Sequence, residues 1–465
     1  MKPVLPIVLA KVPPITPFDI TFGMWGGQNP GADPFGGSTR PEYLIIRDDQ
    51  GIEGEIADRK AIIEKNLRGI ADLNKKMVAK AIARGAKFPQ SYRITGISFH
   101  DEDVFPADAS DEQILEIIQW LKALLKELDL KVQCYTTNLF SHPAFRSGAF
   151  TSPLGGVRDA AMVKSFRGIK VAVELEAKNI IIWGGREGTE FYEQDIVLAL
   201  HRFMINAKIV IDYAFSVGYK GTFTFEPKQW EPRFQLFAGS EGVFSALIRQ
   251  YFADEKYRGR IGVNPELPQH VAMSGLSPVV AASNMLLLED MISVLHYGGQ
   301  PAGRMDADFA PGLGGNIFED FHTFLLLHLH SDRWGKVIEL DCRPCRTTTT
   351  FEGMLRFLEW SILFIRSIED KVRIYVRDPV IGKIQAEQMA SVSQAEIDLA
   401  EGGHVHLDPG SIARRLLENA QPLSAVAAIP TDSNEAHAYR TLQIVMGQQD
   451  SGISLFDDTP WAVAS

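Results

Sequence analysis

The sequence predicts an α/β fold, a (β/α)8 barrel of parallel strands, and three observations support this prediction. Short apolar runs alternate with longer segments in which apolar residues recur at intervals of three and four. Eight such runs occur, each followed by a helical segment. Five of them lead into a side chain that can bind a metal. Eight strand–helix units are typical of a closed parallel barrel, and a doubly wound open sheet is the alternative.

The expected elements follow one another in regular order. The strands are expected at 20–22, 97–99, 132–135, 180–183, 223–225, 261–263, 292–295 and 337–340. Helices are expected at about 56–84, from a cap at Asp111 through Leu125, and at 160–175, 195–215, 242–251, 278–288, 318–330 and 351–368. A polar, glycine-rich loop separates the first strand from the first helix.

The barrel pattern ends near Asp378-Pro379, which divides the chain into a catalytic domain at 1–378 and a C-terminal arm at 379–465. The arm is rich in Ala, Gln, Ser and Asp, with helical pieces near 385–389, 394–399 and 409–418. It has too few apolar residues for a core of its own. We therefore expect it to pack on a second subunit in a homo-oligomer, a dimer or tetramer.

Composition excludes several classes of protein. The net charge of −11 over 465 residues argues against nucleic acid as a partner, because phosphate binding needs clustered Lys and Arg. The three cysteines, an odd and sparse set, indicate a reducing compartment, so a cytoplasmic location is expected. The apolar stretch near the N-terminus is short, contains prolines and ends at Lys11, which does not resemble a secretory signal. No run is long enough to span a membrane.

The runs that end in polar side chains predict a metal site. They lead into His100, Glu226, Glu266, His296 and Asp341. In parallel barrels the C-terminal ends of the strands meet on one face, where active sites lie. Three carboxylates and an imidazole from the last four strands suit Mg²⁺, Mn²⁺ or Co²⁺.

Three further features extend this prediction. Asp306 and Asp308 form an Asp-x-Asp pair that suggests a second ion. Asp103 follows His100 by three residues, so it can hold one imidazole nitrogen and leave the other for proton transfer. Lys228, two residues after Glu226, points to the same side and can polarise a carbonyl group.

Several longer stretches resemble the xylose (glucose) isomerase family. These stretches lie at 22–25, 33–36, 99–103, 136–140, 183–188, 226–233, 264–266, 306–308 and 341–347. Their order and spacing hold over about residues 20–380. The resemblance implies a homotetrameric enzyme that interconverts an aldose and a ketose, of the D-xylose/D-xylulose or D-glucose/D-fructose type. The family opens the sugar ring and then moves a hydride between adjacent carbons with metal assistance.

The resemblance also implies roles for individual residues. His100 would aid ring opening with Asp103 orienting it, and Lys228 would bind the substrate's carbonyl oxygen. The implied substrate-binding residues are Trp25, Thr136, Phe140, Trp183 and Arg343, with Phe35 reaching in from a neighbouring subunit. Two divalent cations are implied, the first held by Glu226, Glu266 and Asp341 and the second by Glu266, Asp306 and Asp308.

Three departures from the family pattern leave the sugar and the metal open. His296 stands where the family has a carboxylate. The related rhamnose isomerases and ketose epimerases resemble this sequence in having His at that position. A ligand histidine is replaced by Gln269, and His270, one residue later, is the favoured ligand. Arg343 stands where the family has Lys. The other hypotheses are a ketose epimerase or sugar lyase with one metal, and a non-catalytic sugar-binding paralogue.

Overall fold

The computed structural model describes residues 12, 14–28, 51–188, 195–229, 236–267, 277–288, 291–301, 308–346, 348–389, 409–418, 420–427 and 432–448. By its internal contacts the chain forms two compact units, Pro17–Arg366 and a second made of Met1–Thr16 with Ser367–Ser465. The helix α11 crosses the boundary between them. The assignment of catalysis to 1–378 and of subunit association to 379–465 stays a prediction.

The larger unit alternates strands and helices. Its strands are β1 Asp19–Gly23, β2 Ile94–His100, β3 Lys131–Thr136, β4 Asn179–Trp183, β5 Thr222–Glu226, β6 Ile261–Val263, β7 Glu266–Leu267, β8 Leu295–Tyr297 and β9 Val337–Leu340. Its helices are α1 Trp25–Gln28, α2 Gly51–Ala83, α3 Asp101–Val104, α4 Asp111–Glu127, α5 Gly155–Glu174, α6 Ile196–Ser216, α7 Glu241–Tyr251, α9 Pro278–Leu287, α10 Ile317–Leu329 and α11 Phe351–Tyr375. Short 3₁₀ helices lie at Pro89–Ser91, Pro143–Phe145, Glu255–Tyr257 and Pro344–Arg346.

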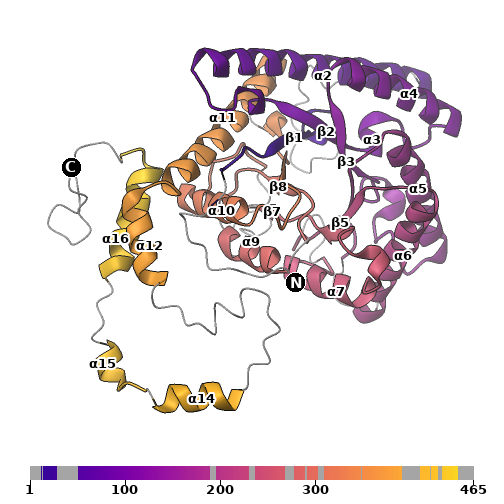
Figure 1. Cartoon of the computed structure of the whole chain (residues 1–465). Coiled ribbons are helices and arrows are strands. Elements are labelled where there is room, and N and C mark those ends of the chain that lie inside the picture. Colours follow the sequence, from indigo (N-terminus) through magenta and orange to yellow (C-terminus); the bar gives the residue numbers. More distant parts are fainter. Residues whose placement is uncertain are drawn as a thin grey trace. The chain divides into compact units, whose positions relative to one another are not determined.

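The described strands form one parallel sheet that closes on itself, so the predicted barrel is confirmed. The hydrogen-bonded order is β6-β5-β4-β3-β2-β1-β9-β8-β7. Its two ends, β6 and β7, are pieces of one strand interrupted at Asn264-Pro265. Val263 pairs with Ile292, and Glu266 pairs with His296. The interrupted strand therefore contacts β5 on one side and the β8 region on the other. In Figure 1 these strands lie inside a ring of helices.

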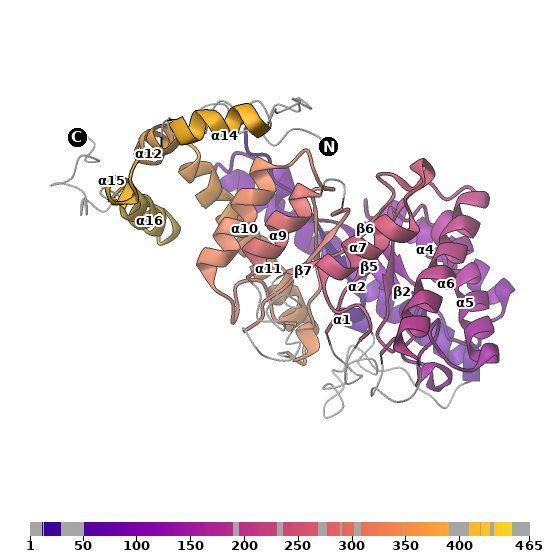
Figure 2. The ribbon, with the colours of Figure 1, turned by 90° about the horizontal axis from the view of Figure 1, so that it is seen from below.

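Side chains alternate between the barrel interior and the layer of helices outside it. On β5, Phe225 points outward, and its ring lies 5.2 Å from Phe244 of α7 and 6.1 Å from Phe203 of α6. Thr224, one residue earlier, points inward and accepts a hydrogen bond from Asn179 of β4. Turning the molecule by 90° shows helices α4, α5 and α6 outside the strands (Figure 2). The same alternation sends Glu226 inward at the strand's end.

Most predicted elements agree with the structure to within a few residues, and the helix cap predicted at Asp111 is wrong. Ser110 caps α4: its hydroxyl accepts a hydrogen bond from the backbone of Gln113, whose side chain accepts one from the backbone of Ser110. Both residue types cap helices well, and only the reciprocal pair with Gln113 distinguishes them. The last helix of the barrel, α11, continues to Tyr375, beyond the predicted end at 368.

The smaller unit contains α12 Pro379–Met389, α14 Pro409–Glu418, α15 Leu423–Ala427 and α16 Asp432–Val445. Helices α12 and α16 pack together around Val380, Ile384 and Ala436. Arg440 of α16 donates to Asp378 at 2.7 Å, which fastens α16 to the start of α12. The predicted helix at 394–399 lies outside the described residues. None of the described helices combines the length and apolar character that crossing a membrane requires.

The closure of the barrel depends on close approach of backbones at Gly262. A Cβ atom added there would lie 2.5 Å from the carbonyl oxygen of Met291. Gly262→Ala should therefore lower the free energy of unfolding by about 1–3 kcal/mol, the usual cost of overpacking. Thermal melting followed by circular dichroism measures the effect.

Gly242→Ala is the matched control, because a Cβ at this position in α7 meets nothing within 4 Å. Alanine is also the better helix former, so this variant should melt at the wild-type temperature or slightly above it. Equal melting temperatures for the two variants would contradict the close packing at the seam.

Candidate metal centre and active site

Charged side chains from successive strands meet at the C-terminal end of the barrel. Glu226 is the last residue of β5, His296 lies within β8, and Asp341 directly follows β9. His100 is the last residue of β2. Since the strands among the described residues run in parallel, their ends meet on one face, as the sequence predicted. Side chains of the described residues line an open cavity there: Trp25, His100, Thr136, Trp183, Glu226, Lys228, His296, Asp308, Asp341 and Arg343.

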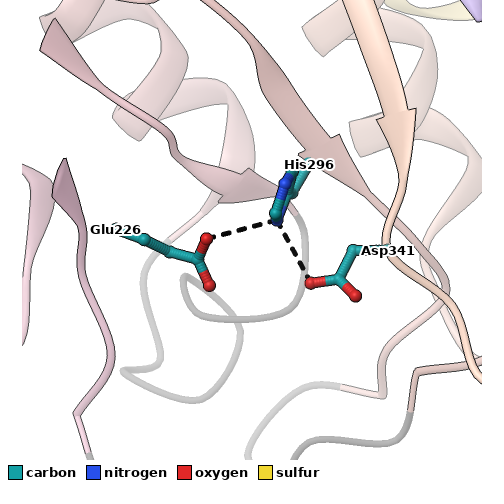
Figure 3. A group of neighbouring side chains, drawn as sticks. All are labelled: Glu226, His296 and Asp341. Carbon is teal, nitrogen blue, oxygen red and sulfur yellow. Dashed lines mark ion pairs between the residues drawn. The ribbon is translucent and has the colours of Figure 1, made fainter. Parts of the chain in front are cut away.

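Glu226, His296 and Asp341 form one close group (Figure 3). Nδ1 of His296 lies 3.4 Å from Oε2 of Glu226 and 3.2 Å from Oδ2 of Asp341. The ligand atoms of all three lie within 4.8 Å of one another, so one ion could bind them together. Asn264 holds the group in place. Its side chain donates to Glu226 at 2.8 Å and accepts from the backbone of His296 at 3.0 Å.

Burial and mutual repulsion govern the charges of this group. Burial raises the pKa of Glu226 to about 7, and Asp341 adds to the increase, while His296 and Lys228 oppose it. For His296, burial by itself lowers the pKa, but Glu226, Asp341 and Glu339 together raise it well above its ordinary value. Without a metal, the protonated imidazole of His296 thus supplies the positive charge among the acidic side chains of Glu226, Asp341 and Glu339. The donor set and its excess of negative charge fit a divalent cation.

A second group consists of Glu266, Asp308 and Asp341, and it shares Asp341 with the first. Asp308 is also engaged by two guanidinium groups. Its Oδ2 lies 2.9 Å from Nε of Arg343 and 3.0 Å from Nη1 of Arg346. The backbone of Arg343 donates to the carbonyl of Asp308, which binds the loop after β9 to that residue. Two arginines therefore balance part of the negative charge in this group.

His100 and Asp103 are adjacent, as the sequence predicted. Nδ1 of His100 lies 3.3 Å from Oδ2 of Asp103, and the same oxygen accepts a 2.8 Å hydrogen bond from the backbone of His100. Asp103 belongs to α3, which begins directly after β2, so the spacing of three residues returns its side chain to the strand end. The arrangement leaves Nε2 of His100 as the nitrogen available to a substrate.

The aromatic rings of Trp25 and Trp183 line the cavity, and Phe140 contacts residues that line it. The rings of Trp25 and His100 lie 4.8 Å apart, and Phe140 makes edge contacts with His100 at 5.2 Å and with Trp183 at 4.3 Å. The ammonium of Lys228 lies 5.1 Å from the ring centre of Trp183, which fixes its direction. The indole N–H of Trp25 donates to Asp341 at 2.6 Å. Through this hydrogen bond, Trp25, a predicted substrate-binding residue, contacts the group of candidate metal ligands.

Glu339 is part of the site that sequence reasoning missed. It lies in β9 and is fully buried, and its Oε1 is 3.1 Å from Nε2 of His296. The signal was available: Glu339 of β9 lies two residues before Asp341, and residues two apart in an extended segment face the same side. Glu339 lies inside the apolar run 337–340, whereas the pattern that predicts site residues marks only the side chains at the ends of such runs.

Three predicted site residues lie outside the described residues: Phe35, His270 and Asp306. The choice between Gln269 and His270 falls there as well. Their roles stay predictions.

No protein-family model matches the sequence. Among solved structures, a D-tagatose 3-epimerase-like protein is 14% identical with a TM-score of 0.47, covering 60% of this chain and 91% of its own. A 3-keto-D-glucoside 4-epimerase from E. coli is 13% identical with a TM-score of 0.46, covering 75% and 99%. A D-psicose 3-epimerase from Clostridium cellulolyticum H10 is 13% identical with a TM-score of 0.46, covering 66% and 93%. Similarity at this level leaves the function to be argued from the site itself.

The raised pKa values predict how the stability of the metal-free protein varies with pH. Glu226 keeps its proton up to about pH 7 in the folded state, whereas the unfolded chain releases it near the ordinary value of 4.5. The folded state binds more protons in this range, so the contribution of Glu226 to stability is lost as the pH rises from about 4.5 to 7. The raised pKa of His296 acts in the same direction. In the presence of a chelator, the melting temperature of Glu226→Gln should fall less between pH 5 and pH 8 than the melting temperature of the wild type does.

Added Mn²⁺ or Co²⁺ should raise the wild-type melting temperature more at pH 8 than at pH 6, because the ligands must lose their protons to bind. Parallel pH profiles for wild type and the variant would contradict the role of Glu226. A metal-induced shift of the same size at both pH values would contradict the proton release.

Proposed function

We propose that this protein is a metal-dependent sugar isomerase that interconverts an aldose and a ketose. One observation carries the proposal: the group of Glu226, His296 and Asp341 opens into the same aromatic-walled cavity as Lys228 and His100. A sugar offers this cavity vicinal oxygens for a metal, a carbonyl for an ammonium group, and C–H faces for aromatic rings. The substrate class follows from that chemistry, and the particular sugar is left to experiment.

The metal requirement rests on the donor set. Glu226, His296 and Asp341 would hold one ion, and Glu266 and Asp308 with Asp341 would hold a second. Mg²⁺, Mn²⁺ and Co²⁺ suit such ligands, and a divalent cation supplies electrophilic stabilisation of negative charge on the substrate's oxygens. The resemblance makes Glu266 the shared ligand, whereas the groups formed by the described residues share Asp341. The number of ions and the shared ligand both stay proposals.

The chain's own residues account for the remaining requirements of the reaction. His100, oriented by Asp103, can move a proton between the ring oxygen and the anomeric hydroxyl as the sugar ring opens. Lys228, held over Trp183, donates to the carbonyl oxygen of the open chain. Trp25, Phe140 and Trp183 exclude water from the carbons between which hydrogen moves. Exclusion of water favours direct transfer of hydride over exchange of a proton with solvent.

A ketose epimerase with one metal is the second candidate, and the arginines at Asp308 favour it. Arg343 and Arg346 neutralise Asp308, so the second group needs an ion less than the first does. A single ion at Glu226, His296 and Asp341 would then serve a reaction that removes a proton from one carbon and returns it to the other face.

An isotope experiment separates the two reactions. We expect the protein, loaded with Mg²⁺, Mn²⁺ or Co²⁺, to convert at least one member of a panel of pentoses and hexoses between aldose and ketose forms. A hydride shift keeps a deuterium label placed at C2 of the aldose, which NMR would find at C1 of the ketose. Deuterium uptake from ²H₂O into the product indicates the epimerase instead. Absence of sugar turnover with every metal would reject both candidates.

Lys228 provides a test within the isomerase hypothesis. Lys228→Met keeps the length and apolar contacts of the side chain but removes its hydrogen bond to the carbonyl oxygen. We expect kcat to fall by about 10²–10³-fold, the usual loss when one such donor is removed.

The affinity for Co²⁺ should change little, because the metal ligands remain. Lys122→Met, at an exposed ion pair between helices, is the matched control and should retain full activity. Equal kcat for the two variants would remove Lys228 from the mechanism.

A further inference from the structure

Glu339 is a buried carboxylate in the barrel interior whose position calls for a function. It has no exposed surface, and a charge in such a place costs free energy unless partners compensate it. We propose that Glu339 is a positioning residue that fixes the imidazole of His296, so that Nδ1 is the nitrogen that binds the metal. The inference rests on the metal-dependent function proposed above.

Each oxygen of Glu339 has its own partner or partners. Oε2 accepts hydrogen bonds from the hydroxyl of Thr21 at 3.2 Å and from the hydroxyl of Ser98. Ser98 in turn accepts a 2.9 Å hydrogen bond from the backbone of Cys134, which fixes its hydroxyl. Oε1 is left to face Nε2 of His296 at 3.1 Å. Two donors on one oxygen hold the carboxylate plane, so its second oxygen points in one direction.

Strand register places these residues at one level. Thr21 of β1 pairs with Glu339 of β9, and Glu339 pairs with His296 of β8. In-register neighbours in a parallel sheet project to the same face, here the barrel interior. The contact between Glu339 and His296 is therefore set by the backbone of three adjacent strands and does not depend on a mobile loop.

This contact decides which nitrogen faces the cavity. A carboxylate accepts a hydrogen bond, so Nε2 carries the hydrogen and Nδ1 presents its lone pair when the imidazole is neutral. Nδ1 is also the nitrogen that lies near Glu226 and Asp341, as Figure 3 shows. The described residues that line the cavity include His296 but not Glu339, so Glu339 acts through the histidine.

The test uses Glu339→Gln in the full-length protein, with Co²⁺ as the probe. The amide preserves volume but removes the charge that orders the two hydroxyls and the imidazole. Substitution of such partners usually weakens metal binding about 10- to 100-fold, and we expect a loss of this size by isothermal titration. The visible absorption of bound Co²⁺, which reports ligand geometry, should change as well.

Asp320→Asn is the matched control. Asp320 is also a buried carboxylate, and it accepts a hydrogen bond from Tyr297, the residue next to His296. Its loss should leave the Co²⁺ affinity and spectrum at wild-type values. A Co²⁺ affinity for Glu339→Gln within threefold of wild type would overturn the proposal, provided that His296→Ala loses binding.

A second measurement needs no variant. The crystal structure of the Co²⁺-loaded wild-type protein should show Nδ1 of His296 on the ion and Nε2 on Glu339, and the reverse assignment overturns the proposal. Failure of the wild type to bind Co²⁺ at this group would overturn both the proposal and the metal-dependent function. Loss of affinity in Glu339→Gln, in a protein that turns over no sugar, would support the proposal and reject only the isomerase.

Discussion

The electrostatic balance around His296 is the interaction on which the whole site depends. One imidazole stands among Glu226, Asp341 and Glu339, all brought inward by the closed sheet. Like charges at this spacing repel one another strongly where water is scarce. A protonated histidine can hold them in a metal-free protein, and a divalent cation can do so with the histidine neutral. The two states are alternatives, because Nδ1 cannot carry a proton and bind a metal at once.

Much of the fold could be predicted because polar side chains end several of the apolar runs that form strands. An apolar run that ends in Glu226 or His100 reveals both the strand and the face on which its last side chain lies. The interruption of the sixth strand could not be predicted in detail, although Pro265 was visible. A proline cannot donate to the sheet, but the sequence does not show that pairing resumes at Glu266. The cap of α4 at Ser110 differs from the expected Asp111 for a similar reason, since both residue types suit that position.

The site was predicted less completely than the fold, and the reason is physical. Residues at strand ends were found by their position, whereas Glu339 lies within a strand and acts on another side chain. Arg346 was expected only as part of a resembling stretch, and its ion pair with Asp308 depends on a short 3₁₀ helix, Pro344–Arg346, that spacing alone does not predict. Contacts between side chains of different strands require the register of the sheet, which a single sequence does not contain.

The interrupted strand, β6 and β7, closes the barrel and also carries a candidate metal ligand, Glu266. Elsewhere the sheet is held by runs of paired residues, but at the seam Val263 pairs with Ile292, and Glu266 and Leu267 pair with His296 and Tyr297. A seam held by few backbone hydrogen bonds opens locally at a lower cost in free energy than a longer run of paired residues, and its amide hydrogens exchange earlier. Glu266 and His296 lie on its two sides, and both are candidate ligands. Ions held by the two groups, which share Asp341, would tie the two sides of this seam together, so metal loading should slow amide hydrogen exchange in β7 and β8.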